Sequence, residues 1–223
     1  MSDLEKRAPQ MIEDAFREGN YEKVLEIRDS TKNRRFINKD WEMMHRFTAA
    51  AAFVLAGGLS SHDKGMLKRA KYEANMAMTY GASSDLVAKY NYCFTLALLS
   101  HILYPLCGRP AAFGFMIKAR EIYPNSSDLV AADAALCVQA GEYENGIKNA
   151  ILAITLAKQE ERPMVEASAH YYLSLAYKGL SRNNEAREQM EIASRIMEKE
   201  RLEDSSSALE HCVVEANRAI QKM

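Results

Sequence analysis

The stretch YPNSSDLVAADAALCVQAGEYENGIKNAILA, residues 123–153, predicts a hairpin of two helices. Ser126, Ser127 and Asp128 follow a proline-containing turn and are N-cap candidates, because their side-chain oxygens can accept the free backbone N–H groups of a first helical turn. Small and apolar residues then recur at helical spacing as far as Gly141, where the first helix is expected to end. A second apolar face follows, and small residues lie where the two helices would cross.

Two parts of this hairpin are echoed elsewhere in the chain. Residues 80–88 read YGASSDLVA and residues 123–131 read YPNSSDLVA, 43 residues further on (123 minus 80). Residues 17–26, REGNYEKVLE, resemble residues 139–148, QAGEYENGIK, around a shared Gly-x-Tyr turn. Self-similarity at such a period is typical of stacked helical repeats.

The helical pattern extends over nearly the whole chain, and no stretch alternates long enough to predict a strand. A long apolar helix over 84–104 is expected to end at Pro105 and Gly108. We predict one all-α repeat domain, residues 1–223, of about eleven helices. Its units are five hairpins and a C-terminal capping helix, at residues 5–37, 38–83, 84–126, 127–166, 167–200 and 207–222.

The capping helix is predicted from a capping box at Ser207–Glu210, in which the serine and glutamate side chains satisfy free N–H groups reciprocally. Apolar residues after it share one face: Leu209, Cys212, Val213, Ala216 and Ile220. Such a face would close the last repeat. It would also allow self-assembly through the terminal helix, so a homo-oligomer is one alternative.

Composition limits the classes of function. The chain has 223 residues, of which 48% are hydrophobic, and its formal net charge is −1. A packed core is therefore expected, and nonspecific nucleic-acid binding is disfavoured. Four cysteines, at 93, 107, 137 and 212, lack metal-type or disulfide-type spacing and are interpreted as buried, reduced thiols.

No membrane attachment is expected from the sequence. The start of the chain lacks the apolar segment of a secretory signal. The most apolar run, residues 93–107, is short of the roughly 18–20 residues that a membrane-spanning helix needs. A cytoplasmic location is therefore predicted.

The repeat resembles the tetratricopeptide repeat (TPR), whose pattern is W-x2-L-G-x2-Y, then A-x3-F, then P, over about 34 residues. The last unit carries this resemblance best, through His170, Leu173, Ser174, Tyr177, Ala186, Met190 and Ala193. The unit before it supplies Ala134, Cys137, Gly146, Ala150 and Ala153. The middle units are longer than the family's, and another α-solenoid of the HEAT type is the alternative fold.

The resemblance implies a superhelix with a concave groove, lined by first helices, that binds an extended peptide or a partner helix. By register with the family, the groove would be lined by Arg46, Phe94, His101, Tyr104, Gln139, Tyr171, Leu175 and Lys178, with Ala49, Ala131 and Ala135 beside them. This set is aromatic and small, so it favours a hydrophobic or mixed peptide over a C-terminal carboxylate clamp.

Catalytic motifs are absent from the sequence. There is no H-E-x-x-H, no G-x-S-x-G elbow and no phosphate-binding loop. The five histidines, at 45, 62, 101, 170 and 211, lack metal-type spacing and are interpreted as packed or solvated. We therefore expect no enzyme activity, no cofactor and no metal site.

The leading hypothesis is a non-enzymatic protein–protein interaction module: a scaffold, an adaptor or a chaperone-like protein. Self-assembly through terminal helices is the second. The third is a nucleic-acid-associated regulator, which would use the basic clusters Lys32–Arg35 and Lys68–Lys71. Stacking aromatics are sparse beside these clusters, so a solvated helix face is the simpler interpretation of both.

Overall fold

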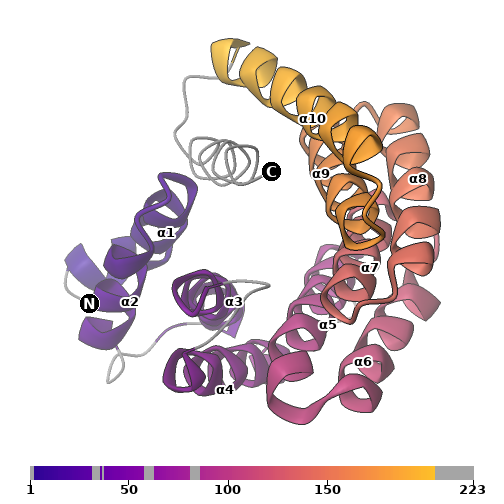
Figure 1. The fold of residues 1–223 in the computed structure, drawn as a ribbon. Coiled ribbons are helices and arrows are strands. Elements are labelled where there is room, and N and C mark those ends of the chain that lie inside the picture. The colour runs from indigo at the N-terminus through magenta and orange to yellow at the C-terminus, as the bar shows by residue number, and fades with distance from the viewer. Residues whose placement is uncertain (1–2, 32–35, 37, 58–62, 81–85, 204–223) are drawn as a thin grey trace. The chain divides into compact units, whose positions relative to one another are not determined.

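A computed structural model describes residues 3–31, 36, 38–57, 63–80 and 86–203 (Figure 1). These residues form ten α-helices and no strand, so the all-α prediction is confirmed for the part of the chain that is described. The chain divides into two compact units, one within residues 1–119 and one within residues 120–223.

In the first unit each of the first five helices packs on the next one in the sequence or the one before it, and first helices of neighbouring hairpins also meet. The helices are α1 (Asp3–Arg17), α2 (Tyr21–Thr31), α3 (Asn38–Leu55), α4 (Lys64–Tyr80), α5 (Leu86–Cys107) and α6 (Arg109–Ile122), the last three residues of α6 being assigned to the second unit. α1 packs on α2 and α3 packs on α4, as hairpins do. α1 also contacts α3, and α3 contacts α5, so the first helices of successive hairpins lie side by side.

One apolar cluster fills the first unit, and alanine is its commonest member. Ala49, Ala51 and Ala52 of α3 are fully buried and belong to the same cluster as Ala70 and Ala74 of α4. Alanine side chains are short, so the two backbones can approach closely.

The second unit repeats the same packing. Its helices are α7 (Ser127–Gln139), α8 (Tyr143–Gln159), α9 (Pro163–Gly179) and α10 (Asn183–Glu203). α7 packs on α8, α8 on α9 and α9 on α10, while α7 also contacts α9 (Figure 1). The first helices of these two hairpins therefore lie side by side, as in the first unit.

Two glycines show how tightly these helices cross. A Cβ atom on Gly146 of α8 would lie 3.1 Å from Val138 Cγ2 and 3.6 Å from Ala176 Cβ, on α7 and α9 respectively. A Cβ on Gly179, at the end of α9, would lie 2.3 Å from the ring of Tyr143. Tyr143 thus packs on the backbone of the next hairpin, which only a glycine there permits.

Four turns between helices share one geometry. In the α7–α8 turn Gly141 has φ 75° and its N–H donates to Val138 O, while Glu142 N–H donates to Cys137 O. This is the Schellman motif, which places one left-handed residue just past a helix end. The same pair of bonds recurs around Gly19, Glu161 and Ser181, all at positive φ. The Gly-x-Tyr echo is therefore a real structural equivalence, and two further turns adopt the geometry without glycine.

Pro105 does not end α5, contrary to the prediction. The helix continues through Pro105 to Cys107, and Gly108, at φ 78°, ends it. A proline removes one backbone N–H and so disrupts one hydrogen bond. In the last turn few bonds remain to be lost, and Tyr104 O still accepts the N–H of Gly108 at 3.0 Å.

The predicted side-chain caps of α7 are also wrong. Ser126 occupies the N-cap position but makes no side-chain capping bond. Ser127 instead donates its hydroxyl to Glu160, and Asp128 accepts from Arg162, so both side chains bind the α8–α9 turn. The Ser-Ser-Asp segment therefore binds the α8–α9 turn through its side chains and does not cap α7 with them.

Several predictions fall outside the described residues. These are the capping helix at 207–222, the basic cluster Lys32–Arg35, and most of the earlier Ser-Ser-Asp joint at residues 81–85. They stay predictions, as does the assignment of the whole chain to a single repeat domain. Among the described helices, none is long and apolar enough to cross a membrane.

The left-handed turns give a first test. Gly141→Ala should lower the free energy of unfolding by about 1 kcal/mol, because a Cβ at positive φ clashes with its own backbone. Ser181→Gly should raise that free energy by about 0.5 kcal/mol, since it relieves the same clash at the α9–α10 turn. Urea unfolding followed by circular dichroism measures both.

Gly114→Ala is the matched control for these variants. Gly114 lies within α6 with open space where its Cβ would be, so alanine should stabilise the helix by about 0.5–1 kcal/mol. Destabilisation by Ser181→Gly would contradict the assignment of strain to that turn.

Candidate functional site

Three ionisable side chains from three helices meet inside the first unit. The Nε of Arg28, on α2, donates to Glu73 Oε2 of α4 at 3.3 Å. His45 Nδ1, on α3, contacts the same Glu73 oxygen. Arg28, His45 and Glu73 are only 7%, 1% and 5% exposed. We name these three residues the charge cluster.

Helical spacing places each member of the charge cluster on a buried face. Glu73 lies among the buried residues of α4, between Ala70 and Ala77. Arg28 follows buried Val24 by one turn of α2. A charged residue on an apolar face needs a partner, because an unpaired buried charge is costly. Glu73 supplies that partner to Arg28, and its carboxylate also contacts the His45 imidazole.

Aromatic rings surround the cluster. Trp41 stacks on His45 with ring centroids 5.3 Å apart, and Tyr80 stacks on His45 at 5.6 Å. The Arg28 guanidinium lies 5.1 Å from the centroid of the Trp41 ring, within cation–π range. These rings replace water around the charges, which strengthens the attraction within the cluster.

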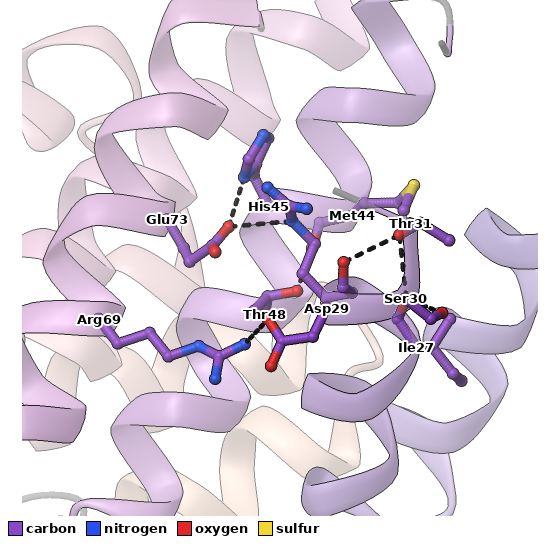
Figure 2. A network of polar contacts seen from close by, with 10 residues as sticks. Ile27, Asp29, Ser30, Thr31, Met44, His45, Thr48, Arg69 and Glu73 are labelled. Carbon is purple, nitrogen blue, oxygen red and sulfur yellow. Dashed lines mark hydrogen bonds and ion pairs between the residues drawn. The ribbon is translucent and has the colours of Figure 1, made fainter. Parts of the chain in front are cut away.

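The charge cluster links α2, α3 and α4 to one another. Breaking a buried pair by removing one partner leaves an uncompensated charge, which is strongly destabilising. Beside the cluster, Arg69 of α4 donates to Asp29 of α2 at 2.7 Å (Figure 2). Two polar links thus join α2 to α4, while His45 joins α3 to α4.

In the part of the chain that is described, no group of three or more His, Cys, Asp or Glu side chains could hold a metal ion.

A second buried histidine lies in the second unit. His170 of α9 is 7% exposed, and its Nδ1 donates to Gln189 Oε1 of α10 at 2.8 Å. Its Nε2 has no hydrogen-bond partner among the described residues and lies 3.8 Å from Glu166 Oε1. Burial lowers the pKa of His170, and the bond to Gln189 and the charge of Glu166 offset part of that effect. The imidazole is therefore neutral at neutral pH.

Four of the residues predicted to line a groove lie in the first unit. Arg46 pairs with Glu42 at 3.0 Å and covers the Phe47 ring. His101 is buried and its ring lies 6.3 Å from that of Phe53. Phe94 is 41% exposed, and Tyr104 is half-buried.

The other four lie in the second unit. Gln139 is the last residue of α7 and is half-buried. Tyr171, Leu175 and Lys178 lie on α9, where the first two are half-buried and Lys178 is exposed. The α9 residues share one helix face. The groove itself stays a prediction.

The histidine and cysteine interpretations can be checked where the residues are described. His45, His101 and His170 are packed, as expected. Cys93 and Cys137 are buried and outside any disulfide among the described residues, and burial raises the pKa of Cys93. Cys107 is exposed at the end of α5, so its interpretation as a buried thiol is wrong. His62, His211 and Cys212 lie outside the described residues.

Sequence reasoning missed Arg28 and Glu73. The signal was present, since each charge interrupts an apolar stripe at helical spacing. The stripe shows that both are turned inward, but it does not show that they face each other. That pairing depends on how α2 and α4 rotate about their axes.

No known protein family matches the chain, and no curated protein matches it.

Neutralising the buried carboxylate tests the charge cluster. Glu73→Gln should lower the free energy of unfolding by about 3–5 kcal/mol, because the buried Arg28 guanidinium would lose the charge that compensates it. Glu26→Gln, in the exposed pair that Lys23 and Glu26 form, is the matched control and should leave stability nearly unchanged. Equal effects of the two substitutions in denaturant unfolding would show that the charge cluster does not stabilise the fold more than an exposed ion pair does.

Acidification tests the neutral state of His170. The unfolded chain protonates this histidine near its ordinary pKa, whereas the folded chain resists protonation, so folding stability should fall as the pH drops below about 6.5. His170→Gln removes this titration. The stability difference between wild type and variant should therefore shrink, or turn in favour of the variant, from about pH 7.5 to about pH 5.5. A difference independent of pH would contradict the assignment.

Proposed function

We propose that this chain is a non-enzymatic, TPR-like interaction module that binds a peptide or partner helix on the surface of its first helices. One observation carries the proposal. In each unit the first helices of successive hairpins lie side by side, α1 with α3 and α3 with α5 in one, α7 with α9 in the other. Stacking of this kind builds the continuous surface on which helical repeats bind partners.

The half-buried face of α9 is the part of this surface with the clearest chemistry. Met164, Ser168, Tyr171, Leu175 and Lys178 recur at helical spacing and are half-buried or exposed. The residues on the other faces, such as Leu173 and Ala176, are buried against neighbouring helices. This face thus carries a tyrosine ring, a thioether, an aliphatic side chain and one cation. Tyr171 and Met164 also pack against the buried Met190 and Met197 of α10.

This combination favours a partner segment with an apolar side chain beside a carboxylate. The ring of Tyr171 supplies large contact area at a small cost in side-chain entropy, and Lys178 can pair with an acidic group. Scaffold, adaptor and chaperone-like roles would all use the same surface. Self-assembly through residues 207–222 remains the alternative.

The test compares wild type with the double variant Tyr171→Ala/Lys178→Glu. Partners captured from the cells that produce the protein are identified by mass spectrometry, and one purified partner is then titrated by calorimetry. We expect the double variant to bind that partner at least tenfold more weakly, because it loses both the ring and the cation.

Lys148→Glu, on the exposed face of α8, is the control and should bind like wild type. Circular dichroism and thermal unfolding establish that each variant is folded. Equal binding by wild type and a folded double variant would reject the α9 surface as the binding site.

A further inference from the structure

We propose that the outer face of α4 binds single-stranded nucleic acid, through lysines that contact phosphates and a tyrosine that stacks on a base. This is a function separate from the peptide-binding proposal, and it lies on a different helix. The face consists of Lys64, Lys68, Lys71 and Tyr72, and we name it the lysine–tyrosine face.

The four residues form one continuous strip. Lys64, Lys68 and Tyr72 follow each other at intervals of one helical turn and are exposed, Tyr72 to 57%. Lys71 flanks them and is half-buried. From Lys64 to Tyr72 the strip is about 12 Å long, at about 1.5 Å per residue. Asn75 continues the exposed strip by a further turn.

No carboxylate of α4 itself faces this strip. The one acidic residue of α4, Glu73, is turned inward and binds Arg28 and His45. No ion pair joins Lys64, Lys68 or Lys71 to a carboxylate among the described residues, although Asp63 precedes Lys64 in the chain. α5, which packs on α4, contains no Asp or Glu in its sequence.

An ion pair between α4 and α2 bounds the lysine–tyrosine face on one side. Arg69, on the flank of α4, is paired with Asp29 of α2 at 2.7 Å. That carboxylate is exposed and would repel phosphates. A strand is therefore expected to run over Lys64, Lys68 and Lys71 and not toward α2.

The exposed ring selects the class of partner. Lysines alone would attract any polyanion, including an acidic peptide. A large aromatic side chain standing outward among them offers a platform for a base, and base–aromatic stacking needs bases that are not already paired. The combination therefore favours a single strand over a duplex or an acidic peptide.

The experiment measures binding of a short labelled oligo(dT) strand by fluorescence anisotropy across a series of salt concentrations. Three lysine–phosphate contacts predict a slope of about −2 for the logarithm of the association constant against the logarithm of the salt concentration. Lys68→Gln should reduce the steepness of that slope by about 0.7, since one contact is lost. Tyr72→Ala should weaken binding roughly tenfold with an unchanged slope, because stacking involves no charge.

Matched variants separate these effects from general charge. Tyr72→Phe keeps the ring and should bind like wild type. Lys148→Gln removes an exposed lysine on α8 and should change neither affinity nor slope. Because the altered side chains are exposed, circular dichroism should be unchanged in all of them.

Three outcomes would overturn the proposal. The first is the absence of oligo(dT) binding at low salt by the full chain. The second is equal affinity for a polyglutamate peptide or for duplex DNA, which would show that only charge is recognised. The third is equal binding by Tyr72→Ala and Tyr72→Phe, which would show that the ring does not stack.

Discussion

The close crossing of helices over small side chains is the constraint on which the rest of this structure depends. Dispersion attraction falls steeply with distance, so helices gain from packing only where their surfaces fit closely. Gly146 and Gly179 mark crossings at which even one added carbon would press on a neighbouring side chain. The side-by-side first helices, and hence any binding surface along them, follow from these contacts.

Small side chains permit close packing, but they specify the alignment of two helices poorly. Alanine has no long side chain that would fit into only one position on the neighbouring helix. We infer that directional polar contacts supply the missing specificity. In the first unit the charge cluster ties α2, α3 and α4 to one another. In the second unit the bonds of Ser127 to Glu160 and Asp128 to Arg162 join the start of α7 to the α8–α9 turn. Each contact is satisfied in only one alignment of the helices.

Much of the fold could be predicted because helix ends depend on local chemistry. Gly19 and Gly141 identify their turns, since glycine tolerates the left-handed conformation that a Schellman motif needs. Glu161 and Ser181 adopt the same conformation without a glycine to indicate it. The capping role of Ser127 failed for a related reason: a partner 33 residues away competes for its hydroxyl.

The sequence by itself determined that the chain forms paired helices, where most of them begin and end, and which faces turn inward. Only the tertiary structure decided that Arg28, His45 and Glu73 meet, although 45 residues separate the first from the last. Periodicity assigns a side chain to a buried face, but it leaves open which of several neighbours that face meets. The choice depends on how each helix is rotated and displaced against the others, and packing of the whole unit sets both.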